Sequence, residues 1–114
     1  MAVNIEEKRS FPRLKFRANL RYQVRGKPDF TDTVSDDISL GGISFVNSKF
    51  MTPANVLMME INLLSRILRP VAKLAWSEPI PHSNRYRCGT EFIEFDPEEE
   101  NYLKDFLSMQ MGRL

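Results

Sequence analysis

The residues from Leu14 to Val24 alternate between apolar and polar without a break. Successive side chains of a β-strand point to opposite faces, so a strict period of two over this length favours a half-buried strand over a helix. A strand with one buried face needs partner strands, and this predicts a chain built mainly of β-structure. The apolar set is Leu14, Phe16, Ala18, Leu20, Tyr22 and Val24, and the polar set is Lys15, Arg17, Asn19, Arg21 and Gln23.

Five further segments have the length and composition of strands. The residues from Gly26 to Asp29 form a turn after the first strand, and Gly41 with Gly42 breaks the chain before the third. The segment from Leu57 to Leu63 also alternates. Its Met, Leu and Glu residues would suit a helix, but we favour a strand because the segments around it are strands of similar length. The expected later strands are Phe30 to Asp36, Ile43 to Val46, Leu57 to Leu63, Val71 to Trp76 and Tyr86 to Phe92.

The period changes near the C-terminus, where a helix is expected. Asp96 suits the N-cap, Pro97 suits the first helical position, and Glu99 completes a capping box. An apolar stripe at helical spacing follows, which we expect to pack against the barrel or against a partner subunit, so the sequence permits a homodimer. The stripe consists of Tyr102, Leu103, Phe106 and Leu107.

These elements predict an all-β fold with one helix. We expect a six-stranded antiparallel β-barrel followed by a C-terminal α-helix from about residue 97. The 114 residues are enough for one domain with a single core. Residues 1–14 have no periodicity and are expected to form a flexible N-terminal arm, while residues 15–114 form the barrel and the helix.

The sequence lacks the groups on which most enzymes and metal proteins depend. His82 is the single histidine and Cys88 the single cysteine, so neither a zinc cluster nor an internal disulfide is expected. A catalytic triad would have to use His82, which we expect to be an exposed loop residue. No GxxxxGK[ST] or GxGxxG loop is present. We therefore expect no enzyme, no metal and no cofactor.

Nothing in the sequence indicates a membrane or a secreted location. The longest apolar runs are far too short to span a bilayer, and the first residues lack the features of a secretory signal. A single cysteine also suits a reducing compartment. We expect a cytoplasmic protein without membrane insertion.

The charges are unevenly distributed along the chain. Lys and Arg total 16 against 15 acidic residues. The segment up to Arg25 is nevertheless strongly basic, whereas acidic residues dominate between Glu91 and Asp105. This distribution is compatible with an anionic ligand near the N-terminus, although such asymmetry by itself more often reflects two solvated faces.

Two short segments carry candidate binding groups. In the first, which runs from Lys8 through Arg9 to Arg13, two arginines are four residues apart. In the second, Asp37, Ser39 and Gly42 follow a DxSxxG pattern in the bend after the second strand. Alone, the first would be a solvated basic arm and the second an ordinary turn.

In this order and on an all-β pattern, the two segments resemble the hallmark motifs of the PilZ domain family of bacterial cyclic di-GMP receptors. Those motifs are an N-terminal RxxxR and a [D/N]xSxxG after the second strand. The resemblance runs from about Glu7 to Leu107 and includes Trp76, the GTEF stretch of the sixth strand and the terminal helix. It implies a PilZ-like split barrel and a cyclic di-GMP site. The implied ligand-binding residues are Arg9, Arg13, Asp37, Ser39 and Gly42, with Lys8 and Gly41 as additional candidates.

The implied ligand suits these groups chemically. A guanidinium matches the O6 and N7 acceptors of guanine and also binds phosphate. An ionised aspartate accepts hydrogen bonds from guanine N–H groups, a serine hydroxyl bonds base or phosphate, and Gly42 lets the backbone approach the ligand. We expect the arginines to close over the ligand from a mobile arm. Ordering of that arm would then create a surface for a protein partner.

Two other functions are compatible with the sequence. Some relatives act as protein-interaction modules in motility or pilus assembly and lack the arginines, which this chain retains, so a module without nucleotide is the less favoured alternative. A barrel that binds RNA or single-stranded DNA would interleave basic and aromatic residues on one face. Here Lys15, Arg17 and Arg21 alternate with Phe16 and Tyr22, so we expect no nucleic-acid polymer as a partner.

Overall fold

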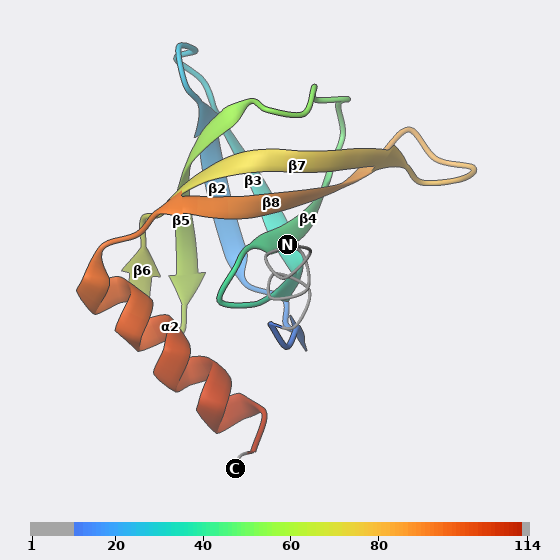
Figure 1. Ribbon diagram of the computed structural model, residues 1–114. Coiled ribbons are helices and arrows are strands. Elements are labelled where there is room, and N and C mark those ends of the chain that lie inside the picture. Colours follow the sequence, from blue (N-terminus) through green and yellow to red (C-terminus); the bar gives the residue numbers. More distant parts are fainter. Residues whose placement is uncertain (1–10, 113–114) are drawn as a thin grey trace, which may run out of the picture.

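The computed structural model describes residues 11–112, which form eight strands and one helix (Figure 1). The short strands β1 and β6 are two and three residues long, and the others have five to nine residues. The strands are β1 (Leu14–Lys15), β2 (Asn19–Val24), β3 (Phe30–Ile38), β4 (Ile43–Asn47), β5 (Val56–Leu63), β6 (Arg66–Leu68), β7 (Val71–Pro79) and β8 (Tyr86–Glu94), and the helix is α2 (Pro97–Gln110).

Six of these strands close into an antiparallel barrel. The order is β3-β2-β5-β7-β8-β4, and β4 pairs back onto β3. This arrangement confirms the six-stranded barrel expected from the sequence, with a strand and not a helix at β5. The two extra strands lie on the barrel's margin, where β1 pairs with β3 and β6 pairs with β5. In Figure 1 the β7–β8 hairpin extends beyond the rest of the barrel on one side, and α2 lies at the other.

The alternation along β2 separates core from surface as the pattern predicts. Leu20 and Tyr22 are buried, and Arg21 between them is exposed. The Tyr22 ring packs against Phe45 with 5.3 Å between ring centroids, and its hydroxyl donates to Asn47 Oδ1 at 2.8 Å. Burial of the ring raises the pKa of Tyr22. Because Tyr22 faces the core, it offers no exposed stacking surface beside the basic residues.

The structure corrects the length of the first strand. The sequence predicts one strand from Leu14 to Val24, but β1 and β2 are separated by a break at residues 16–18. The Ser35 hydroxyl bridges this break, since its oxygen accepts a hydrogen bond from Ala18 N at 2.8 Å and it donates to the carbonyl oxygen of Phe16. The partner strand β3 is irregular at the same level, with a register shift between Ser35 and Asp37. The period of two persists through the break and therefore hides it.

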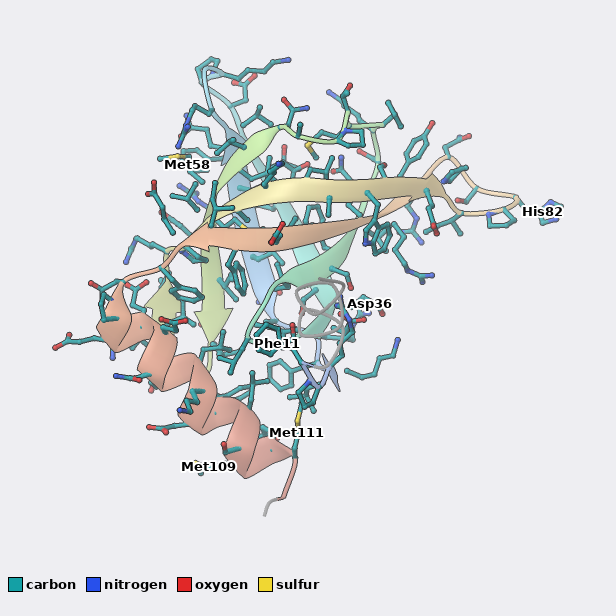
Figure 2. The ribbon with its side chains drawn as sticks, viewed as in Figure 1. Phe11, Asp36, Met58, His82, Met109 and Met111 are labelled. Atoms are coloured by element: carbon teal, nitrogen blue, oxygen red, sulfur yellow. The ribbon has the colours of Figure 1, made fainter. Side chains whose placement is uncertain are left out.

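The strand β6 was not expected from the sequence. It is only three residues long, which is too short to display a period. The turn before it contains Leu64 with a φ of 60°, a conformation that leucine rarely adopts. Because no glycine occupies this turn, the sequence gives no signal for it. His82 also has a positive φ, of 61°, and lies at the exposed tip of the β7–β8 hairpin, as expected for a loop residue (Figure 2).

The helix α2 begins as predicted, with one correction to its cap. Asp96 Oδ2 accepts hydrogen bonds from the backbone N–H groups of Glu98 and Glu99 at 3.1 and 3.2 Å, and Pro97 occupies the first helical position. The predicted capping box is wrong in its second half. Glu99 Oε1 instead accepts a hydrogen bond from the backbone N–H of Arg69 at 2.7 Å, so this side chain fixes the helix to the β6–β7 connection.

The apolar stripe of α2 packs against the chain's own barrel. Leu103, Phe106 and Leu107 are buried. The Phe106 ring meets the Phe16 ring edge-on at 5.0 Å between centroids, and the Tyr102 hydroxyl donates to the carbonyl oxygen of Leu63 at 3.0 Å. The stripe is thus covered within one chain, which removes the reason to expect a dimer through it. Between residues 11 and 112, no helix is long and apolar enough to cross a membrane.

Candidate functional site

Pairing between β1 and β3 brings the two sequence motifs together. In this antiparallel pair Leu14 lies opposite Ile38 and Lys15 lies opposite Asp37. The residue just before β1, Arg13, therefore reaches the beginning of the DxSxxG segment. Its Nη1 donates to Asp37 Oδ1 at 2.8 Å, across 24 positions of sequence. The sequence only suggested that Arg13 and Asp37 are neighbours, and in the structure the two side chains are in direct contact.

Of the two arginines of the RxxxR motif, Arg13 lies within the described residues. Arg9 and the additional candidate Lys8 lie outside the described residues. The expected boundary between arm and barrel, at residues 14 and 15, falls inside β1. The Arg13 side chain is 54% exposed while that of Asp37 is 15% exposed, so the arginine lies over the acid on its solvent side.

Ser39 organises the turn that follows β3. It is 3% exposed, its Oγ accepts a hydrogen bond from Gly41 N at 3.1 Å, and its backbone N–H donates to the carbonyl oxygen of Gly42 at 2.9 Å. This is the local side-chain bonding by which serine stabilises a tight turn. The serine of the motif therefore shapes the bend that holds Asp37 beside the glycines.

The two glycines of the motif approach different neighbours. A Cβ built on Gly42 would lie 1.9 Å from the carbonyl oxygen of Thr90 in β8, which leaves no space for a side chain. A Cβ on Gly41 would lie 2.7 Å from Cδ2 of the Phe11 ring. The resemblance implies that Gly42 lets the backbone approach a ligand, and within the chain its missing side chain also makes room for the Thr90 carbonyl group. Gly41 is the glycine that borders the site, beneath Phe11.

A pocket of about 310 Å³ opens at this place. It combines Arg13, Ser39 and Gly41 of the two motifs with side chains from the barrel wall. Figure 2 shows Phe11 at the side of the barrel that faces the C-terminal end of α2. The pocket is lined by residues just before β1, in the β3–β4 turn, in β7 and in β8. They are Phe11, Arg13, Ser39, Leu40, Gly41, Ala75, Trp76, Thr90, Glu91 and Phe92.

Sequence reasoning missed part of this lining. Phe11 and Phe92 were not proposed as site residues, and Trp76 was noted only as part of a family resemblance. The indole of Trp76 lies on Gly89, because a Cβ there would come within 2.2 Å of its Cε2 atom. Glycine opposite an aromatic residue on adjacent strands is the signal that could have placed this indole.

The charges around the site are balanced by specific pairs. Next to Asp37, the Asp36 carboxylate accepts two cations, with its Oδ2 at 3.7 Å from Lys15 Nζ and 3.5 Å from Arg87 Nε. Three cations thus lie close to these two acids, and a third acid, Glu91, lines the pocket itself, so the charges around the site balance. The exposed Arg13 guanidinium can bind an anionic group, and the Asp37 carboxylate is an acceptor for N–H donors.

Two alternatives for the site within the described residues are a second pocket and a cluster of metal-ligating side chains. A pocket of about 370 Å³ between β3 and the end of β4 is lined by Arg17 and Arg85, but it contains none of the motif residues that line the first pocket. Between residues 11 and 112, no group of three or more His, Cys, Asp or Glu side chains is arranged to hold a metal ion. The pocket beside Arg13 is therefore the candidate site.

Comparison with known families and structures gives the following matches. The family model for the PilZ domain matches residues 7–108. No curated protein sequence matches the chain. Among solved structures, the inhibitor of motility MotI/DgrA of Bacillus subtilis has a TM-score of 0.75 at 19% identity, over 90% of this chain and 51% of that one.

Two further structures are complexes with cyclic di-GMP. The PilZ domain of YcgR from Escherichia coli has a TM-score of 0.70 at 16% identity, over 90% of this chain and 91% of that one. MrkH of K. pneumonia has a TM-score of 0.71 at 15% identity, over 90% and 51%. The chain spans about half the length of the Bacillus and Klebsiella proteins. At these identities the likeness establishes a shared fold.

Proposed function

The chain belongs to the PilZ domain family, a family of cyclic di-GMP receptors, and from this premise we propose that it binds cyclic di-GMP in the pocket beside Arg13 and Asp37. The observation that carries the proposal is the 2.8 Å contact between these two side chains, which joins the two motifs at one pocket. The structures of YcgR and MrkH with cyclic di-GMP support the choice of ligand.

The site offers the groups that the ligand requires. Arg13 is exposed and supplies a planar fork of N–H donors, which matches either the O6 and N7 edge of guanine or a phosphate. Asp37 supplies acceptors for the N–H donors of guanine. In the structure the Arg13 guanidinium donates a hydrogen bond to the Asp37 carboxylate. A ligand therefore has either to break this hydrogen bond or to bind the groups that it leaves free. An exposed ion pair of this kind contributes only about 0–1 kcal/mol, so its loss is a small cost against ligand contacts.

The proposed role is that of a receptor and not of an enzyme. Arg9, Ser39 and Gly42 complete the proposed site together with Arg13 and Asp37, and Lys8 and Gly41 are further candidates. Binding would move Arg13 and the segment before it, and this movement would change the surface offered to a protein partner. No cofactor is required. The proposal places the protein in the cytoplasm, in agreement with the free thiol of Cys88.

Replacing Arg13 by alanine tests the site. One bidentate contact to a guanine edge is worth about 1–3 kcal/mol, so the Arg13→Ala variant is expected to bind cyclic di-GMP about 5- to 150-fold more weakly in isothermal titration calorimetry. Its circular dichroism spectrum should stay that of the parent, because Arg13 is half exposed. Arg25→Ala, an exposed arginine in the turn at the other end of β3, is the matched control.

The outcomes separate the alternatives. Equal binding by parent and Arg13→Ala would mean that the pocket is not the ligand site. No binding by the parent would favour a protein-interaction module that works without nucleotide. Retention on single-stranded nucleic acid that falls steeply with salt would point to a polymer partner.

A further inference from the structure

The candidate pocket presents two charged side chains of opposite sign. Among the described residues that line it, only Arg13 and Glu91 are charged. Asp37 is not one of the lining residues, and its carboxylate, which is 15% exposed, accepts the hydrogen bond from Arg13. The carboxylate that the pocket itself presents is therefore that of Glu91.

The register of β8 brings Glu91 to the outer face of the barrel, near the Trp76 indole. Thr90 is 8% exposed and its hydroxyl donates to the carbonyl oxygen of Ile43, so alternation directs Gly89 and Glu91 on either side of it outward. The Trp76 indole lies over Gly89. Two residues along a strand span about 7 Å, so Glu91 follows the indole at that distance along β8. Glu91 is partly exposed and lines the pocket, and a ligand there can reach it.

The other lining side chains give the pocket walls that suit a nucleobase. Phe11, Leu40, Trp76 and Phe92 contribute aromatic or aliphatic surface, which accepts the flat face of a base. The charged groups then meet the edges of the base. A carboxylate only accepts hydrogen bonds and repels a phosphate, so its presence in the pocket indicates a ligand that also carries N–H donors.

We propose that Glu91 is a specificity-determining residue that accepts hydrogen bonds from the N1–H and 2-amino groups of one guanine of cyclic di-GMP. This inference rests on the proposed function and adds to it a residue outside both motifs. Because the ligand carries a guanine at each end, Asp37 and Glu91 can each serve one base. A site built to hydrogen-bond a group rejects the analogue that lacks it, so Glu91 makes the site selective for guanine.

Cyclic di-IMP tests this role, because its bases lack only the 2-amino group of guanine. A hydrogen bond to a charged group changes affinity by about 10- to 150-fold, so the parent should prefer cyclic di-GMP over cyclic di-IMP by at least about tenfold in calorimetry. In Glu91→Ala this preference should fall by about tenfold. Glu91→Gln keeps the size of the side chain and one acceptor, so its preference should fall less. Glu94→Gln, at an exposed glutamate of β8 outside the pocket, is the control and should keep the preference of the parent.

The preference between the two ligands separates recognition from a structural role. Replacing a structural glutamate would weaken the binding of both ligands equally and leave the preference unchanged. An unchanged preference in both Glu91 variants, or a parent that binds both ligands equally, overturns the inference and leaves the proposed function intact. If Glu91→Ala does not fold, the preference of Glu91→Gln decides. A parent protein that does not bind cyclic di-GMP refutes the proposed function and this inference together.

Discussion

The same substitution should destabilise the protein strongly at one of the two adjacent glycines of the DxSxxG motif and only slightly at the other. Gly42→Ala would put a methyl carbon 1.9 Å from the Thr90 carbonyl oxygen, whereas a carbon–oxygen contact needs about 3.3 Å. The β3–β4 turn and β8 would have to separate by about 1.4 Å to relieve this contact. Neither Gly41 nor Gly42 has a positive φ, so the backbone conformation itself tolerates alanine and the effect is steric.

The hydrogen bonds that tie the turn to β8 set the magnitude. Thr90 Oγ1 accepts from Ile43 N at 3.3 Å and donates to the Ile43 carbonyl oxygen at 2.8 Å, and Phe92 N donates to the carbonyl oxygen of Gly41 at 2.9 Å. Losing three such bonds costs about 3 kcal/mol, in line with the 1–3 kcal/mol typical of overpacking. We expect Gly42→Ala to lower the free energy of unfolding by about 3–4 kcal/mol, a large part of the 5–15 kcal/mol typical of a domain.

Gly41→Ala is the matched comparison. Its methyl carbon would meet Cδ2 of Phe11 at 2.7 Å, but this ring is at the end of a flexible side chain and is 39% exposed. The ring can move, so we expect a loss below about 1 kcal/mol. Urea denaturation followed by circular dichroism measures both variants. A Gly42→Ala protein within about 1 kcal/mol of the parent, or a Gly41→Ala protein equally destabilised, would refute the steric reasoning.

Two further predictions concern groups away from the pocket. Ser35→Ala leaves the Ala18 N–H and the Phe16 carbonyl without their bridging hydroxyl, so the free energy of unfolding should fall by about 1–3 kcal/mol in urea denaturation; an unchanged midpoint would mean that water replaces the hydroxyl. Burial raises the pKa of the Cys88 thiol above its ordinary value of 9.0, so above that pH the unfolded chain binds fewer protons than the folded one and stability should decline as the pH rises. Cys88→Ala should lose that part of the decline, and an identical pH dependence in parent and variant would contradict it.

Much of the fold follows from local pattern. The alternation of β2, the turn glycines and the cap at Asp96 each have a physical cause within a few residues, and the structure confirms the barrel and the helix that they predict. The alternation did not predict the break after β1, because the residue that bridges it, Ser35, belongs to another strand. The hydrogen bond between Glu99 and Arg69 was not predicted for the same reason, since sequence spacing favours a local cap over a partner 30 residues away.

The sequence by itself determined the class of fold, the two candidate motifs and, through the resemblance, the family and the kind of ligand to test. Periodicity and motif spacing are local properties, because each depends only on residues that are close together in the sequence. Only the tertiary structure decided that Arg13 touches Asp37, that Gly42 faces Thr90, and that Glu91 lines the same pocket as Arg13. These relations depend on the register between strands that are far apart in the chain, and register is fixed by packing of the whole barrel.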